Sequence, residues 1–397
     1  MVVECENYSD VEVVVGSYEE FVLGFKALKT EDGMVRLSQS FANHSHRASV
    51  RCVAGGGRFM ASGGADDNVQ LYDMKLRKEM GVLMHHDKTV TCVAFAGSTH
   101  LLSGSDDGQI ALWRSGSWQC EKVLHAHTDT GVTALAVHPS GKLCLSVGKD
   151  GTLRTWNLVK GRPAYTTNLH AVGEEVAFSE DGSLYAVLKL VKGGAHVLVD
   201  VYKTEIAGVV YSIDLRTRLS CITFLQDDLI AVGTDTGLVE VHRVSSKGCV
   251  CRFETKADRV RKISACRFAS GETWLITAAS NGQISIFSFK KRLSEENGEL
   301  SVPKLIGSVS TGCRPTCLAL VVSPQGAVEP KVKGEQLEEK ILLPEVRPTI
   351  PKRGVVTVEL EDSDEEKKKK KKDIKGRNKN AVAKKKRKRS AGKSGKD

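Results

Sequence analysis

A short pattern recurs along this chain at intervals of about 42 residues, and it constrains the fold more than any other feature. In each copy a Ser precedes an Asp by four residues, and an aromatic residue follows the Asp six residues later. The fullest copies are Ser62, Asp66 and Tyr72; Ser103, Asp107 and Trp113; and Ser146, Asp150 and Trp156. A looser copy has Thr277, Asn281 and Phe287, another keeps only Asp235, and His196 stands where a further Asp is expected. Such self-similarity indicates a repeat architecture.

A second series has a similar spacing. Short segments rich in Val, Ile and Cys, bounded by Gly, Asp and Ser, alternate apolar and polar residues as strands do. These segments centre on Val53, Val93, Leu135, Val176, Ile222, Cys266 and Leu318. Four strands in each repeat of about 42 residues is the period of a WD-repeat propeller. The sequence therefore predicts an all-β fold, a seven-bladed WD40 β-propeller.

The two ends of the repeat region predict how the ring closes. Near its C-terminal end only the innermost strand of a last blade is visible, at residues 315–321. The missing outer strands are available near the N-terminus, at residues 11–15, 18–25 and 34–41, and Phe25 falls where the aromatic residue of a repeat belongs. We expect one blade built from both ends, because closure removes an exposed sheet edge.

The residue types of the repeat predict a buried polar network in each blade. Asp-Gly and Asp-Asp are tight-turn dipeptides, and such an Asp can accept a hydrogen bond from a His in the preceding loop while Ser and the aromatic residue complete the network. A buried carboxylate left without partners would cost about 1–3 kcal/mol or more. The predicted network residues are His46, Ser62, Asp66, Tyr72, His86, Ser103, Asp107, Trp113, His127, Ser146, Asp150, Trp156, Asp235 and Asn281.

A Ser/His/Asp trio could also suggest a hydrolase, but the pattern favours a structural role. The trio recurs at a fixed period, whereas a nucleophilic site is normally built once, and no G-x-S-x-G turn exposes the serine. The pairs His44/His46 and His125/His127 lack a complete set of metal ligands. The eleven cysteines form no C-x-x-C pair, so we expect reduced thiols in an intracellular protein. We predict no enzymatic activity, catalytic residue, metal or cofactor.

Charge divides the chain into two predicted domains. Residues 331–397 hold 23 Lys/Arg against 12 Asp/Glu, a net charge of +11, while the whole chain has +10, so the remaining residues are close to neutral. The strand pattern fades at about Pro324. We predict a propeller over residues 1–323 and a disordered linker and polybasic tail over 324–397. No run of 18 apolar residues occurs and Met1–Asp10 is polar and acidic, so we expect neither a membrane span nor a signal peptide.

The predicted tail has three charged segments. An acidic stretch, 359–366, is followed by a lysine run and then by a second basic cluster. The basic residues are Lys367, Lys368, Lys369, Lys370, Lys371, Lys372, Lys384, Lys385, Lys386, Arg387, Lys388 and Arg389. Such clusters are typical of nuclear import signals and of electrostatic RNA contacts, and less specifically of solubilising tails. Ser363, in an acidic context, is a candidate phosphorylation site whose modification would add about −1.5 to −2 charge beside the lysine run.

Three stretches carry a family resemblance: residues 16–25, the pair His85-His86, and above all residues 138–162. They resemble the p21-activated protein kinase-interacting protein 1-like family of nucleolar WD-repeat proteins, over roughly residues 12–320. The resemblance implies a protein of the nucleus and nucleolus that is needed for maturation of the large (60S) ribosomal subunit. It also implies an ability to bind and restrain a p21-activated protein kinase.

The leading expectation is a scaffold in ribosome biogenesis and rRNA processing. The propeller would bind ribosome assembly factors on the pre-60S particle, as a monomer within a larger complex, and the tail would contact rRNA. The alternative is a signal-transduction adaptor that acts as a protein kinase inhibitor. The tail favours the first reading, because an adaptor has no evident need of residues 384–389.

Overall fold

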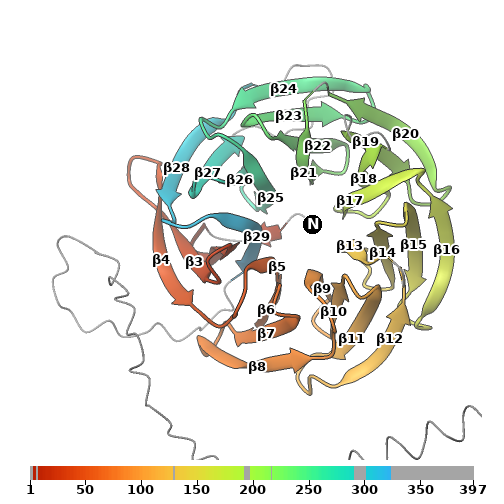
Figure 1. Cartoon of the computed structure of the whole chain (residues 1–397). Coiled ribbons are helices and arrows are strands. Elements are labelled where there is room, and N and C mark those ends of the chain that lie inside the picture. The colour runs from red at the N-terminus through yellow and green to blue at the C-terminus, as the bar shows by residue number, and fades with distance from the viewer. Residues whose placement is uncertain are drawn as a thin grey trace, which may run out of the picture. The chain divides into compact units, whose positions relative to one another are not determined.

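The computed structural model describes residues 3–5, 8–127, 130–191, 197–215, 217–289 and 301–322. These residues form seven sheets, or blades, arranged around a central channel (Figure 1). The chain divides into two units, residues 1–331 and 332–397, and all described residues belong to the first. The prediction of a seven-bladed all-β propeller is confirmed. The predicted boundary at residues 323/324 lies outside the described residues and stays a prediction.

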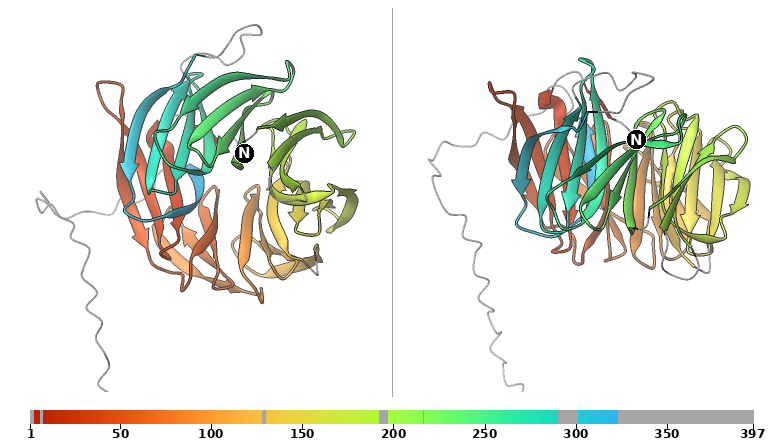
Figure 2. Two further views of the ribbon diagram at one scale, coloured as in Figure 1. Left: turned by 45° about the horizontal axis from the view of Figure 1, so that its top comes forward. Right: turned by 90° about the horizontal axis from the view of Figure 1, so that it is seen from above.

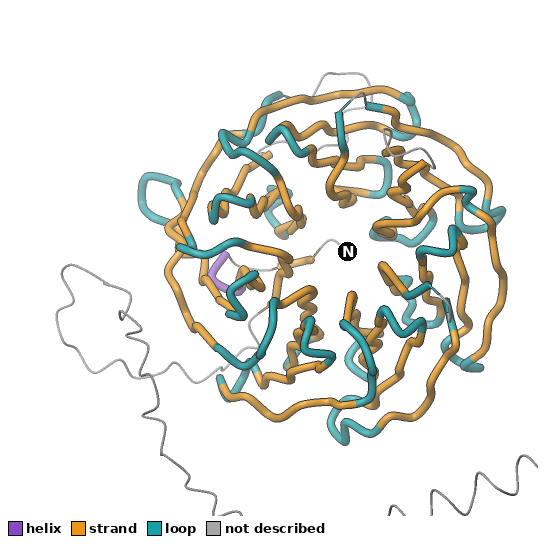
Figure 3. The backbone as a smooth tube through the Cα atoms, in the orientation of Figure 1, coloured by secondary structure: helices purple, strands orange, loops and turns teal. Residues whose placement is uncertain are grey.

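Each blade has four antiparallel strands that follow one another from the channel outward (Figure 3). In blades 1 to 7 the innermost strands are β29 (Pro315–Val322), β5 (Val50–Gly56), β9 (Val90–Ala96), β13 (Val132–Val137), β17 (Ala171–Phe178), β21 (Leu219–Gln226) and β25 (Val260–Phe268). The second strands are β2 (Val11–Ser17), β6 (Phe59–Gly64), β10 (His100–Ser105), β14 (Leu143–Gly148), β18 (Leu184–Val191), β22 (Leu229–Thr234) and β26 (Thr273–Ala279).

The outer half of each blade has the same regularity. The third strands are β3 (Val22–Lys29), β7 (Asn68–Asp73), β11 (Gln109–Arg114), β15 (Thr152–Asn157), β19 (Val197–Lys203), β23 (Leu238–Arg243) and β27 (Gln283–Phe289). The outermost strands are β4 (Val35–Asn43), β8 (Lys78–Met84), β12 (Cys120–His125), β16 (Arg162–Asn168), β20 (Gly208–Asp214), β24 (Gly248–Glu254) and β28 (Lys304–Ser310). Two short elements remain, β1 (Val3–Cys5) and the 3₁₀ helix η1 (Tyr8–Asp10).

Blade 1 combines both ends of the repeat region, as predicted. The innermost strand β29 pairs with β2 from Val11 opposite Val322 to Ser17 opposite Pro315. Phe25 on β3 lies opposite Val13, just as Trp113 lies opposite Leu101 in blade 3, so Phe25 occupies the aromatic position of the repeat. Figure 2 shows the resulting closed disc from two further directions.

One predicted strand boundary is wrong. The sequence pattern predicts a strand throughout residues 18–25, but residues 18–21 form the turn between β2 and β3 and the strand continues to Lys29. The turn is tight because Glu20 adopts a positive φ of 72°, which lets the Ser17 amide donate to the Phe21 carbonyl. Apolar residues in a turn resemble a strand in sequence, which explains the error.

The hydrophobic core is divided into seven clusters, and each cluster fills the space between two neighbouring blades. Between blades 7 and 1, for example, Ile276 and Ile284 pack with Val13 and Phe25. This division follows from strand alternation, since each central strand presents one set of side chains to the blade before it and the other set to the blade after it. A blade therefore cannot bury its faces alone, and the ring is stable only when complete.

One strand was not predicted. The segment β1 pairs in parallel with the inner edge of β25, with Val3 opposite Cys266 and Cys5 opposite Phe268. These partners lie at the end of β25, so β1 lies beside the channel wall at the end away from Arg261. Among the described residues, no helix has the length and apolar character needed to cross a membrane.

Candidate functional site

The polar network of blade 3 connects four side chains from three chain segments. His86 Nδ1 lies 2.8 Å from Asp107 Oδ2, and His86 Nε2 lies 2.8 Å from Ser103 Oγ. Trp113 Nε1 donates to the same Ser103 Oγ over 2.9 Å. The tautomer that satisfies every atom has His86 donating from Nδ1 and Ser103 donating to Nε2. The network thereby fixes the turn between β10 and β11 to the loop before β9.

Blades 2 and 4 repeat this arrangement. His46 Nδ1 lies 3.0 Å from Asp66 Oδ1, His46 Nε2 lies 2.7 Å from Ser62 Oγ, and the Tyr72 hydroxyl lies 3.3 Å from Ser62 Oγ. The matching contacts of blade 4 are His127 Nδ1–Asp150 Oδ2 at 2.8 Å, His127 Nε2–Ser146 Oγ at 3.0 Å and Trp156 Nε1–Ser146 Oγ at 2.9 Å. All three serines have 0 % exposure. A buried hydroxyl that is held between two partners offers no accessible nucleophile.

The pKa of the carboxylate is lowered in all three networks, which favours its ionised form. Burial raises the pKa of Asp107, but hydrogen bonds from His86 and the Gln109 amide outweigh it, so the net pKa lies below its ordinary value. The pKa values of Asp66 and Asp150 are lowered in the same way. Burial also lowers the pKa of His127, and the hydrogen bond with Asp150 only partly opposes this.

The frame predicted for blade 6 is wrong by one residue. The Asp235 amide donates to the Arg218 carbonyl, just as the Asp106 amide donates to Thr89 in blade 3, so Asp235 corresponds to Asp106 and not to Asp107. Thr236 occupies the network position instead. In blade 7 Asn281 does occupy that position, and its Oδ1 accepts from the Gln283 amide, but no contact between Asn281 and a histidine was found among the described residues. His196 lies outside the described residues.

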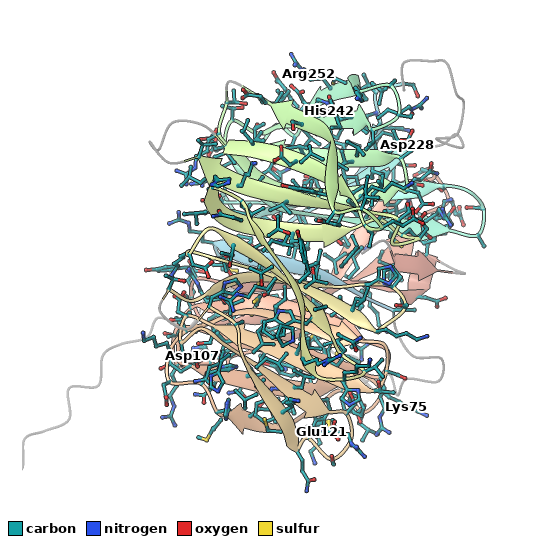
Figure 4. The ribbon with its side chains drawn as sticks, turned by 90° about the vertical axis from the view of Figure 1, so that its right-hand side faces the viewer. Lys75, Asp107, Glu121, Asp228, His242 and Arg252 are labelled. Atoms are coloured by element: carbon teal, nitrogen blue, oxygen red, sulfur yellow. The ribbon has the colours of Figure 1, made fainter. Side chains whose placement is uncertain are left out.

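Blade 6 contains a different polar cluster on its outer strands. His242 stands at the aromatic position, opposite Ile230, and contacts Glu240 Oε2 at 3.1 Å and the Tyr211 hydroxyl of blade 5 at 3.0 Å. Glu240, His242 and Cys249 could in principle hold a metal ion. Glu240 Oε1, however, already lies 2.6 Å from an Arg252 guanidinium nitrogen, so the cluster is neutralised as it stands. Figure 4 shows His242 and Arg252 in one part of the ring, away from Asp107.

The innermost strands carry the residues that face the channel mouth. Each innermost strand contains a β-bulge near its start, where one extra residue interrupts the pairing with the second strand. A bulge re-aims the side chain of its extra residue. From blade 1 to blade 7 the bulge residues are Thr316, Arg51, Thr91, Thr133, Glu174, Ser220 and Arg261.

Four of these bulge residues carry a hydroxyl that joins neighbouring blades. Thr91 Oγ1 donates to the Gly104 carbonyl of its own blade or to the Val132 carbonyl of the next blade, at 3.1 and 2.7 Å. Thr133, Ser220 and Thr316 make matching contacts. Arg51, Glu174 and Arg261 occupy the same position without such a hydroxyl, so at three blades the link is replaced by a charge at the channel mouth.

The residue after each bulge forms a second ring deeper in the wall. Cysteines occupy it in four blades, and burial raises the pKa of Cys92 to about 12 and that of Cys317 to about 11, so these thiols are protonated packing residues. The ten cysteines whose side chains are described are all free. In blades 5 and 7 the residues of this second ring are Glu175 and Lys262, which form an ion pair between two blades that are not neighbours, since blade 6 lies between them.

A depression opens at this mouth of the channel. Its lining includes five bulge residues together with Tyr18, Lys149, Asp106 and Arg314. The Ser…Asp…aromatic pattern does not indicate this site, because the site is built from bulge residues that lie outside the pattern. A signal was available, since the segments Val50-Arg-Cys-Val53 and Val90-Thr-Cys-Val93 align with each other and differ at the bulge residue. The predicted tail sites, including Ser363, Lys367–Lys372 and Lys384–Arg389, lie outside the described residues.

Seven blades, three intact Ser/His/Asp/aromatic networks and a ring closed by both ends define a WD-repeat propeller. Models of the "WD domain, G-beta repeat" match residues 35–73, 77–114 and 118–157, and the "Anaphase-promoting complex subunit 4 WD40 domain" matches residues 225–295.

Comparison with known proteins places the chain in one family. It is 39% identical to "p21-activated protein kinase-interacting protein 1-like" of Danio rerio over 78% of this chain and 80% of that protein. It is 31% identical to "p21-activated protein kinase-interacting protein 1" of Homo sapiens, over 78% and 77%, and 26% identical to "Shk1 kinase-binding protein 15" of Schizosaccharomyces pombe, over 83% and 89%. The chain belongs to the p21-activated protein kinase-interacting protein 1-like family.

Proposed function

We propose that this protein is a non-catalytic scaffold in the nucleolar assembly of the large ribosomal subunit and in pre-rRNA processing. The propeller binds assembly factors on the precursor particle, and the basic tail directs the protein to the nucleus and contacts RNA. The observation that carries the non-catalytic part is the burial of all three Ser/His/Asp trios, each with 0 % exposure at its serine. These trios hold turns in place and leave the channel mouth as the surface for partners.

The division of charge supports two separate roles. The excess positive charge lies in residues 331–397, while residues 1–330 are close to neutral. A neutral rigid ring suits protein partners, whose interfaces depend on shape and on a few anchor residues. A polybasic segment suits import receptors and RNA phosphates, and its contacts weaken as salt rises.

The location and sedimentation of the tagged protein, whole and truncated after Pro330, test this proposal. We expect the whole protein in the nucleolus and in gradient fractions that contain large-subunit precursors. Truncation should weaken both signals while the propeller stays folded. A diffuse cytoplasmic signal without association with precursor particles would contradict the proposal.

A second candidate is the binding and inhibition of a p21-activated protein kinase. The names of the relatives favour it, since those of zebrafish and human are described as kinase-interacting and that of fission yeast as kinase-binding. The experiment is a pull-down of purified kinase catalytic and regulatory segments with the whole protein, followed by a kinase assay. Binding that lowers kinase activity supports this candidate, and binding without inhibition restricts it to adaptor function.

A further inference from the structure

Five arginines gather at the bulge end of the channel. Arg51 and Arg261 are bulge residues, and Arg218, Arg259 and Arg314 each immediately precede the innermost strand of a blade. They come from blades 6, 7, 1 and 2, which are consecutive around the ring. We call this set the arginine sector.

The backbone fixes three of these arginines at equivalent places. The residue before an innermost strand accepts, through its carbonyl, a hydrogen bond from the turn between the second and third strands of the same blade. Arg218, Arg259 and Arg314 accept in this way from Asp235, Ser280 and Tyr18. In blades 2, 3 and 4 the same carbonyl belongs to Ser49, Thr89 and Gly131. This contact is made by the backbone alone and does not dictate the side chain, and among these six blades only blades 6, 7 and 1 carry arginine there.

The charges of the sector are not neutralised within the described residues. No ion pair with a carboxylate was found there for any of its five guanidinium groups, and Arg259 Nε and Arg261 Nε are buried without a hydrogen-bond partner. Burial lowers the pKa of Arg261, and the four other arginines of the sector lower it further. Mutual repulsion of this kind is a cost to the free protein that a bound anion removes.

Few carboxylates face the sector. Glu174 interacts electrostatically with Arg218 and Arg259, but burial dominates and raises its pKa. Asp106 pairs with Lys149 across the mouth at 2.5 Å, and Glu19 accepts from the Arg314 amide. The sector thus keeps a net positive charge beside a depression.

We propose that the arginine sector binds an acidic peptide segment of a partner protein, whose carboxylates pair with the guanidinium groups at the channel mouth. Arginine presents a planar fork of donors that matches a carboxylate. Deeper in the channel, beyond the second ring, the wall combines apolar residues such as Val53, Ile222 and Leu318 with the ion pair of Glu175 and Lys262, and its apolar part accepts an apolar side chain of the same peptide. This proposal does not depend on whether the protein acts in ribosome assembly or binds a kinase.

A peptide fits the site better than RNA does. RNA carries a negatively charged phosphate at every nucleotide, so some phosphates would lie against the carboxylates of Glu174 and Asp106. A peptide, in contrast, can place its carboxylates only where the arginines lie. Single-stranded RNA also binds through several stacked aromatic side chains. At this mouth the described lining contains one aromatic residue, Tyr18, whose ring lies 6.0 Å from the Arg314 guanidinium carbon.

Binding of a short fluorescein-labelled peptide of alternating Glu and Leu, measured by fluorescence anisotropy, tests the proposal. The basic tail would also attract this probe, so the comparison is made between full-length variants of equal charge. The test variant is Arg218→Glu/Arg314→Glu, and the control is Arg36→Glu/Arg162→Glu on the outermost strands β4 and β16. All four arginines are exposed, so the fold should tolerate both changes.

We expect the test variant to bind the peptide about tenfold more weakly than wild type, because each reversal removes an attraction and adds a repulsion. The control should stay within about twofold, since only the tail and the net charge act on it. Equal losses in both variants would overturn the proposal. A single-stranded RNA oligonucleotide of matching charge serves as the second probe. Loss of RNA binding alone in the test variant would also overturn it and assign the sector to RNA.

Stability gives a second readout that separates binding from folding. Because the guanidinium groups of the sector repel one another, Arg261→Gln should leave the Tm unchanged or raise it, while it still weakens peptide binding. The peptide should raise the Tm of the wild type and of the control variant more than that of the test variant. A fall in the Tm of Arg261→Gln without peptide would show that Arg261 is structural and would contradict the proposal.

Discussion

The network of blade 3 offers a sharp test of why the repeat residues recur. Replacing Ser103 with Ala removes one hydroxyl that serves two buried partners, the Trp113 indole nitrogen at 2.9 Å and the His86 imidazole nitrogen at 2.8 Å. Trp113 is 5 % and His86 8 % exposed, so neither is expected to find solvent instead. The volume of one hydroxyl is too small to hold a replacement water.

The expected loss of stability follows from these two groups, each left without a hydrogen-bond partner. Each buried unsatisfied group costs about 1–3 kcal/mol, so the two groups together should destabilise the Ser103→Ala propeller by about 2–6 kcal/mol. With an unfolding entropy of about 2 cal/mol/K per residue over roughly 320 residues, this corresponds to a fall in Tm of about 3–9 °C. Chemical denaturation and calorimetry of the purified variant measure both quantities.

Ser62→Ala is the matched control in blade 2. There the aromatic partner is the Tyr72 hydroxyl, at a longer 3.3 Å, and a phenol can both donate and accept, whereas an indole nitrogen only donates. We therefore expect a smaller loss, about 1–2 kcal/mol. A Ser103→Ala variant within about 0.5 kcal/mol of wild type, or a Ser62→Ala variant that loses as much as Ser103→Ala, would refute this account of the network.

Three further predictions concern the ring. Deleting residues 1–30 removes both β2 and β3, and because Val11, Val13, Val14 and Val15 of β2 are at most 1 % exposed, it should lower the Tm by about 10 °C or abolish folding. Deleting residues 1–7, which removes only β1, should cost far less, and equal effects would contradict closure by the N-terminal strands. Burial lowers the pKa of His127, so the unfolded chain protonates this imidazole more readily and the free energy of unfolding should fall as the pH drops below about 6.5. Denaturation of His127→Gln between pH 7 and 5 should show a smaller fall in the free energy of unfolding than wild type. The same pH dependence in both proteins would count against this role of His127. Glu175→Ala leaves Lys262 without its carboxylate partner and should lower the free energy of unfolding by about 1–3 kcal/mol. The double variant Glu175→Ala/Lys262→Met should recover part of this stability. A double variant no more stable than the single one would show that the two residues are not energetically coupled.

The repeat pattern predicted most of the fold because every blade solves the same packing problem. Strand alternation and tight-turn residues recur with each blade, so the innermost strands, the closing blade and the aromatic position of Phe25 could all be located in advance. The blade 6 frame failed because the only remaining marker was Asp235, and Asp is equally suited to the preceding turn position, as Asp106 is in blade 3. One acidic residue cannot fix a register by itself.

The channel mouth could not be predicted in the same way. Arg218, Arg259 and Arg314 are far apart in the sequence, and only the ring brings the starts of their strands together. A bulge residue is also indistinguishable from an ordinary strand residue in an alternating pattern, because the bulge is a property of pairing with the second strand. Charged residues at these positions gain their meaning only when the closed ring is known.

One affinity purification tests the central claim, that this propeller is a scaffold for large-subunit assembly. The tagged full-length protein is purified from cells, and large-subunit rRNA precursors and p21-activated kinase are quantified in the same eluate. The account predicts abundant precursor rRNA with large-subunit assembly proteins, reduced in the Arg218→Glu/Arg314→Glu variant and retained in Arg36→Glu/Arg162→Glu. Recovery of the kinase without precursor rRNA would contradict the account and establish the adaptor instead.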